Sequence, residues 1–194
     1  MPNSNIETHP LPPFLPKNAK ILMLGSFPPK MTRWSMNFFY PNIQNDMWRI
    51  MGIIFYNDKS KFVCHRKFDE ALVKSFCVEK GIAVSDTAAA VIRLQNNASD
   101  KFLQIVENVN LAALLLQIPE CYTIVTTGQK ATDTILSIID AQEPKVGGYS
   151  EFTFIGKCMK LYRMPSSSRA YPKPIEEKAA IYADMFAGTG ILFR

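Results

Sequence analysis

The sequence of 194 residues is poor in the side chains that hold metal ions. It has four cysteines and two histidines, and no two cysteines form a Cys-x-x-Cys pair. A zinc or iron–sulfur site is therefore not predicted, and we expect neither a metal nor another cofactor. The thiols are expected to be reduced and mostly buried.

Long apolar runs are also missing. No stretch approaches the roughly 20 apolar residues that a membrane-spanning helix needs, and the N-terminus is polar and rich in proline. We therefore expect a cytoplasmic protein with no membrane partner. With 47% hydrophobic residues, the chain can build one sizeable core, so we expect a single domain over residues 1–194 and, by default, a monomer.

The motifs of common nucleotide enzymes and hydrolases are absent. The stretch GSFPPKMT lacks the second glycine and the Gly-Lys-Ser/Thr ending of a P-loop, and no Gly-x-Gly-x-x-Gly opens a helix. There is no Gly-x-Ser-x-Gly elbow, and we expect neither His9, in the N-terminal arm, nor His65, in a connection, to lie at a strand end, where the base of a hydrolase belongs. NTPases, nicotinamide dehydrogenases and Ser-His hydrolases are thus disfavoured.

What the sequence does contain is an alternation of strands and helices. Short apolar runs predict strands at residues 20–24, 82–84, 121–127 and 160–164. Helices are predicted from about residue 45, at 68–80, 102–106 and 131–139, and from 174. Residues 1–19, with five prolines, predict an extended arm without regular structure. This pattern is typical of a three-layer α/β/α fold with a short, mostly parallel sheet of about four strands.

Ligands of such sheets bind beyond the carboxyl ends of the strands. The turns there begin at Gly25, Ser85, Thr126 and Pro165. Together they offer amides, small hydroxyls, aromatic rings and an arginine, which suit a stacked planar base and a phosphate backbone. The net charge of +5 fits an anionic partner but is weak evidence by itself.

Six short motifs, by their order and spacing along nearly the whole chain, resemble those of the uracil-DNA glycosylase superfamily. The closest branch is that of the hypoxanthine (deoxyinosine) DNA glycosylases, which is similar to the mismatch-specific uracil glycosylases. The motifs are HPLPP (from residue 9), KILMLGSFP (20), FYPNIQNDMW (39), GIAVSD (81), TTGQKA (126) and MPSSSRA (164). The resemblance implies a DNA repair enzyme that flips out a deaminated base, hypoxanthine or uracil, and excises it to leave an abasic site. Its partner would be DNA that contains such a base.

The resemblance also implies roles for individual residues. Asn45 and Asp86 would be catalytic. Tyr40 would stack on the base, whose pocket floor would be the turn Gly25, Ser26, Phe27 and Pro28. Residues 166–169 (Ser166, Ser167, Ser168 and Arg169) would bind the DNA backbone, and we expect Lys130 to contact DNA as well.

This chain departs from the family in two places. The family's His-Pro is replaced by Pro41-Asn42-Ile43, and its Ser-Pro-Ala-Asn is replaced by residues 168–171. At Phe27, relatives often carry an acid or amide that positions water, although this branch is usually apolar there.

Each assignment has a structural alternative. Asn45 and Asp86 are also typical helix caps, Phe27, Phe38 and Phe39 typical core residues, and Lys130 a typical solvated side chain. Two further functions stay open: a DNA- or nucleotide-binding member of the same fold with little or no activity, and an unrelated small-molecule α/β enzyme.

Overall fold

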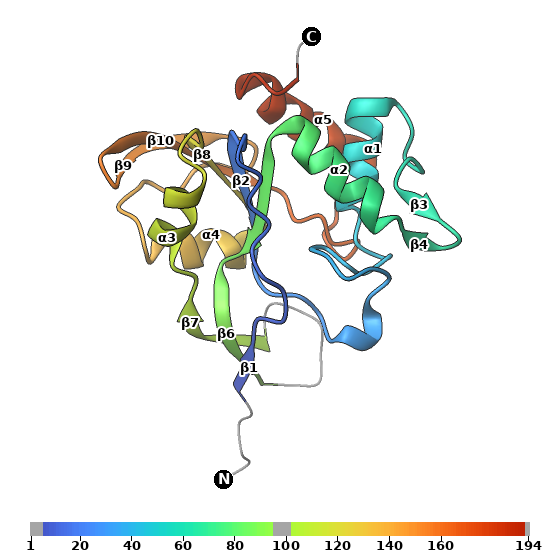
Figure 1. Ribbon diagram of the computed structural model, residues 1–194, viewed down its shortest axis with the longest axis horizontal. Helices are drawn as coiled ribbons and strands as arrows, with labels where there is room; N and C mark the ends of the chain where they lie inside the picture. Colours follow the sequence, from blue (N-terminus) through green and yellow to red (C-terminus); the bar gives the residue numbers. More distant parts are fainter. Residues whose placement is uncertain (1–5, 95–101, 193–194) are drawn as a thin grey trace.

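A five-stranded sheet forms the centre of the protein, whose computed structural model describes residues 6–94 and 102–192 (Figure 1). The strand order is β5-β2-β8-β10-β9. Strands β5 (Ile82–Asp86), β2 (Ile21–Gly25), β8 (Thr123–Thr127) and β10 (Lys157–Met164) are parallel, and β9 (Tyr149–Phe154) runs antiparallel to β10 at one edge. The predicted short, mostly parallel sheet is confirmed. Strand β9, the fifth strand, was not predicted.

The apolar runs produce this sheet because their alternate side chains enter two separate cores. Ile21 and Met23 of β2 pack with α1 (Met47–Tyr56), α2 (Glu70–Lys80) and α5 (Ile175–Gly188). Leu22 and Leu24 pack on the opposite face with α3 (Leu111–Gln117), and α4 (Gln129–Leu136) completes that layer. The three-layer α/β/α architecture is therefore confirmed (Figure 1).

A second, three-stranded sheet lies beyond the central one and corrects two predictions. Its order is β1 (Ile6–Thr8), β6 (Ala88–Arg93) and β7 (Leu103–Asn108), all antiparallel. The helix predicted at residues 102–106 is wrong, because this segment pairs with β6 as a strand. The arm is not free of regular structure, since β1 pairs with β6 and Phe14 forms a bridge with Val84; its residues 1–5 lie outside the described residues.

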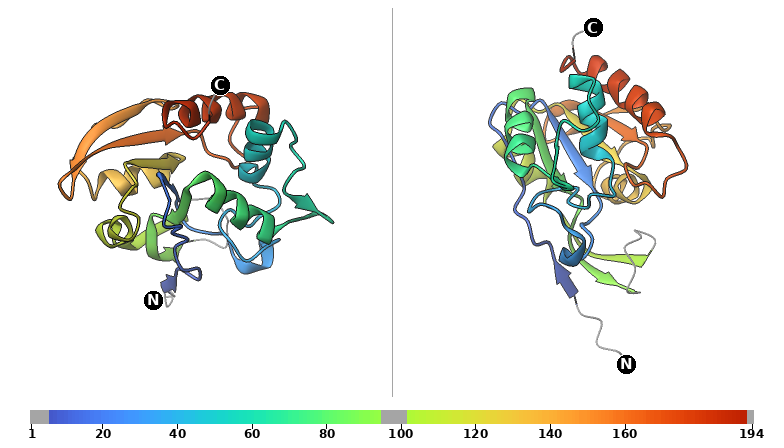
Figure 2. Two further views of the ribbon diagram at one scale, coloured as in Figure 1. Left: turned by 45° about the horizontal axis from the view of Figure 1, so that its top comes forward. Right: turned by 90° about the vertical axis from the view of Figure 1, so that its right-hand side faces the viewer.

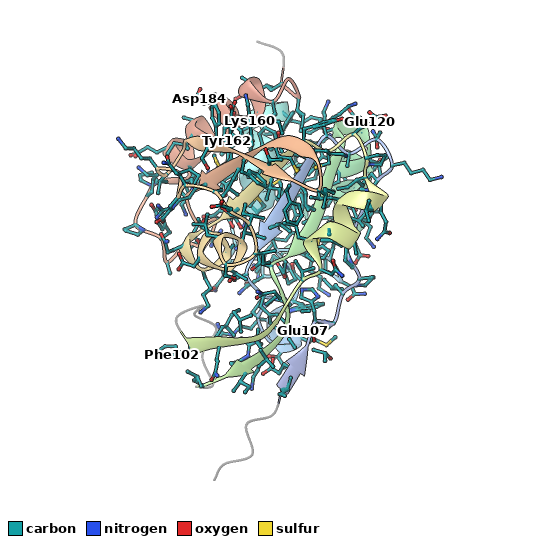
Figure 3. All side chains as sticks on the ribbon, turned by 90° about the vertical axis from the view of Figure 1, so that its left-hand side faces the viewer. Phe102, Glu107, Glu120, Lys160, Tyr162 and Asp184 are labelled. Carbon is teal, nitrogen blue, oxygen red and sulfur yellow. The ribbon has the colours of Figure 1, made fainter. Side chains whose placement is uncertain are left out.

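The small sheet lies at one end of the molecule. Figure 2 shows it at the same end as the N-terminal arm, and in Figure 3 Phe102 and Glu107 mark it well apart from Lys160 and Tyr162 of β10. Three of its side chains, Ala88, Val91 and Leu103, form a small core together with Phe27. Through Phe27 this core touches the turn that follows β2.

The remaining described elements are short. They are a 3-10 turn, η1 (Met31–Arg33), and a hairpin of β3 (Val63–Cys64) and β4 (Lys67–Phe68). None of the helices among the described residues has the length and apolar character needed to cross a membrane.

The thiols are only partly as expected. Cys77 and Cys121 are buried, and burial raises the pKa of Cys121 to about 11, but Cys64 and Cys158 are exposed.

Candidate functional site

All four predicted turns converge on one pocket of about 590 Å³ at the carboxyl edge of the parallel strands. This volume is in the range of small-molecule sites. The lining contains every predicted site residue except Lys130, which lies in α4 away from the pocket. The lining residues that the sequence singled out are Gly25, Ser26, Phe27, Pro28, Tyr40, Asn45, Asp86, Ser166, Ser167, Ser168 and Arg169.

Gly25 and Asp86 lie side by side at the ends of two paired strands. A Cβ atom on Gly25 would lie 2.3 Å from Oδ1 of Asp86 and 3.5 Å from the ring of Tyr40. The carboxylate therefore lies directly over the backbone of residue 25. Only glycine, which has no Cβ atom, leaves room for the Asp86 carboxylate at this position.

Asp86 does not cap a helix, which was the structural alternative. After Thr87 the chain continues into strand β6, and Oδ2 of the buried Asp86 is 2.8 Å from Nε2 of His9. The prediction that His9 lies away from the strand ends is thus wrong. The arm brings it to the end of β5 across 77 positions of sequence, and no local pattern indicates such a contact.

Asn45 bonds to the start of α1 and also lines the pocket. The residue before α1 is Asp46, whose side chain makes no capping hydrogen bond, and Oδ1 of Asn45 accepts the Met47 N–H at 2.9 Å instead. This bond fixes which way the amide faces. Its NH2 group is the part of the side chain that can donate to a ligand, because an amide oxygen only accepts.

Tyr40 is held as a half-buried wall of the pocket. Its backbone has a φ of 52°, a conformation that few residues other than glycine adopt. Its hydroxyl lies 2.9 Å from Oγ1 of Thr127, and its ring meets Trp48 edge-on with centroids 6.1 Å apart. Phe38 and Phe39 are core residues that do not line the pocket, whereas Phe27 belongs both to the pocket and to the core of the small sheet.

The loop of residues 166–171 is tied to the start of α1. The Asp46 N–H donates to the Ser167 carbonyl at 2.9 Å, and Nε of Arg169 donates to Oδ1 of Asp46 at the same distance. Lys178, buried in α5, donates to the Ser168 carbonyl at 2.8 Å. Asp46 and Lys178 were missed, because an acid beside a helix start and a lysine within a helix are ordinary surface features in a sequence.

Gly128 lets this loop approach β8 closely. Its φ is 95°, and an added Cβ would lie 3.3 Å from that of Ser166. The Gly128 N–H also donates to the Met164 carbonyl at 3.0 Å. Two of the four turns are thereby packed directly against each other.

Comparisons with known proteins support the architecture. No family model matches the sequence, and no curated protein shows significant sequence similarity. A solved structure, the solution NMR structure of a "putative Uracil DNA glycosylase from Methanosarcina acetivorans", is similar with a TM-score of 0.66 and 19% identity. The match covers 96% of this chain and 99% of that one. The two chains share one fold.

Positive charge gathers at the side of the pocket where the 166–171 loop meets α1. Arg169 and Arg49 both lie within salt-bridge distance of the buried Asp46, at 2.9 and 3.7 Å. Burial lowers the pKa of Arg49, and the charge of Arg169 lowers it further, while Asp46 opposes both effects. Burial and Arg169 also lower the pKa of Lys178 against the attraction of Asp46. Two arginines thus share one carboxylate, which leaves a surplus of positive charge among these groups.

The loop hydroxyls are arranged as acceptors for their own turn. Oγ of Ser166 accepts the Ser168 N–H, and Oγ of Ser168 accepts the Ala170 N–H, each at 3.2 Å. Their O–H hydrogens remain able to donate to a ligand. Ser167 is buried. In the part of the chain that the structure describes, no three His, Cys, Asp or Glu side chains gather as metal ligands would.

Proposed function

We propose that the protein is a DNA glycosylase that excises a deaminated base, hypoxanthine or uracil, by hydrolysis of the N-glycosidic bond. The observation that carries the proposal is the convergence of Asp86, Asn45 and Tyr40 on one pocket, together with the loop of residues 166–171, which we call the serine loop. The fold it shares with a protein described as a glycosylase supports the same class. We further propose that it works as a cytoplasmic monomer of one domain, without metal or cofactor.

The pocket suits a base that has been turned out of the duplex. Flipping costs a few kcal/mol and is easiest for mispaired bases, which favours deaminated ones. Tyr40 offers a stacking surface, and the amide NH2 of Asn45 can donate to a carbonyl oxygen, which both hypoxanthine and uracil carry. Donation there is strongest when the base departs as an anion, so Asn45 would stabilise the leaving group.

Asp86 is the group proposed to act on water. As the C1′–N bond breaks, its electron pair stays with the base and the sugar gains oxocarbenium character. A water oxygen then bonds to C1′, and its proton passes to the carboxylate of Asp86. Phe27 cannot position water, so Asp86 replaces the acid or amide that relatives often have in that turn.

The loop of residues 166–169 is proposed to hold the DNA backbone beside the flipped nucleotide. The hydroxyls of Ser166 and Ser168 can donate to phosphate oxygens. Arg169, whose side chain is 52% exposed although it pairs with Asp46, can add a charged contact. The surplus positive charge there would be offset by phosphate.

The test is a single-turnover assay with excess protein on duplexes that each contain one hypoxanthine, uracil or xanthine, followed by alkali. Strand cleavage that requires the alkali treatment is the expected result, and it identifies the base. Intact strands with all three lesions, from folded protein, would overturn the proposal. Salt-dependent DNA binding would then indicate a binding protein of this fold, and its absence a small-molecule enzyme.

A further inference from the structure

We propose that His9 is a positioning residue of this site and that the N-terminal arm is therefore part of the active centre. His9 would donate its Nε2–H to Oδ2 of Asp86, which orients the carboxylate and leaves Oδ1 for the attacking water. The inference rests on the proposed function and deepens it.

The contact between the two side chains is short and shielded from solvent. Nε2 and Oδ2 are 2.8 Å apart, and the side chains are only 12% and 8% exposed. A carboxylate accepts hydrogen bonds but donates none, so the hydrogen belongs to Nε2. A hydrogen bond to a charged group in such a place is stronger than one at the surface.

The other ring nitrogen, Nδ1, has a hydrogen-bond partner whether the imidazole is neutral or protonated. Nδ1 lies 3.2 Å from the Leu11 nitrogen and 2.9 Å from the Leu11 carbonyl oxygen. A neutral ring can accept at Nδ1, and a protonated ring can donate there. Nε2–H faces Asp86 in both forms.

The imidazole is fixed from several directions. Phe27 meets it edge-on at 5.2 Å between centroids, and Phe39 stacks on it at 5.8 Å. The His9 N–H donates to the Ala89 carbonyl at 2.8 Å, directly after the pairing of β1 with β6. A group held so firmly can in turn hold the carboxylate that it contacts.

Orientation matters because Asp86 has so little space. Oδ1 lies only 2.3 Å from the position that a Cβ atom on Gly25 would take, so the plane of the carboxylate decides what Oδ1 presents to the pocket. Without the bond to His9, the carboxylate could rotate about its last torsion. Small misplacements of a reacting group are costly in rate.

Two substitutions separate the hydrogen bond from ring packing. His9→Phe keeps a ring between Phe27 and Phe39 but removes the N–H, whereas His9→Gln loses the ring but keeps an N–H that can reach Asp86. We expect His9→Phe to lower the maximal single-turnover rate by about 100-fold, and His9→Gln by less than about 10-fold. The protein concentration for half-maximal rate should change little in both.

Either of two results would overturn the inference. One is a His9→Phe variant as fast as the wild type, and the other is a His9→Gln variant no faster than His9→Phe. Inactive wild type would instead overturn the proposed function itself. If His9→Phe loses its cooperative unfolding transition, His9→Ala with added imidazole takes its place. Partial rescue of the rate is expected there, and no rescue would count against the role.

The other histidine provides a matched control. His65 is exposed in the β3–β4 turn at a φ of 47°, which asparagine tolerates, so His65→Asn should keep the wild-type rate. A double variant of His9→Phe and Asp86→Asn should be no slower than Asp86→Asn alone, because both changes remove the same interaction between His9 and Asp86. Additive losses would place His9 outside this interaction.

Discussion

The two sheets of this protein contribute to the pocket in different ways. The carboxyl ends of β2, β5 and β8 and the loops after β2 and β10 line it directly, whereas β1, β6 and β7 contribute no lining residue. The small sheet acts from behind: it packs on Phe27 and carries the strand that leads to His9. The central sheet thus presents the polar groups, and the small sheet supports two residues beside them, Phe27 and His9.

The largest effect is expected where the two contributions meet, at Asp86. Asp86→Asn keeps the size of the side chain but removes the negative charge that would accept a proton from water. We expect the single-turnover rate to fall by about 10²- to 10⁴-fold while affinity for lesion DNA is kept. Rate and binding are measured separately, by alkali-dependent cleavage and by anisotropy. An unchanged rate would show that the central sheet presents no essential carboxylate.

The central sheet was predictable because each of its parallel strands is marked by a short apolar run in the local sequence. Gly25, Asp86 and Ser166 each follow an apolar run that predicts a parallel strand, and the carboxyl ends of parallel strands meet at one edge. Fold and pocket lining followed from this pattern together with the resemblance of the motifs. Strand β9 was missed because Tyr149–Phe154 mixes apolar and polar residues and lacks the continuous apolar run by which the other strands were recognised, and its hairpin turn has only Gly156 as a signal.

The small sheet was not predictable in the same way. Its pairing of Ile6 with Ile92 joins positions more than 80 residues apart, and prolines around the arm indicate only an extended chain. The apolar residues of β7, among them Leu103 and Ile105, have a spacing that fits either a short helix or a strand, so the sequence does not decide between the two. His9 was missed for this reason, since its partner is chosen by tertiary pairing.

A second prediction sharpens the geometry at the meeting point. Gly25→Ala would place a Cβ atom 2.3 Å from Oδ1 of Asp86, so the carboxylate must move. We expect a loss of about 100-fold in the single-turnover rate. The control is Gly156→Ala, which is strained by its φ of 75° but meets no atom within 4 Å. This control should lower the melting temperature and keep the rate; equal rates for both variants would refute the crowding argument.

A third prediction concerns the link between the sheets. Arg93 of β6 donates through Nε and Nη2 to the carboxylate of Glu7 in β1, at 3.1 and 3.0 Å, and through Nη2 to the Pro28 carbonyl at 3.2 Å. Its side chain is only 5% exposed. Lysine cannot make this forked set of bonds, so Arg93→Lys should lower the free energy of unfolding by about 1–3 kcal/mol. Urea unfolding measures the change, and a loss below about 0.5 kcal/mol would contradict the link.

The smallest expected effect distinguishes the pocket rim from its surroundings. Arg169 lines the pocket and Lys130 does not, although both were predicted to contact DNA. Arg169→Gln should reduce the slope of log affinity against log salt by about 1, the value for one phosphate contact. Lys130→Gln should leave the slope unchanged. Anisotropy titrations at several salt concentrations measure both variants. Equal reductions would extend the DNA-binding surface along α4, and an effect of Lys130 alone would move the DNA path away from the serine loop.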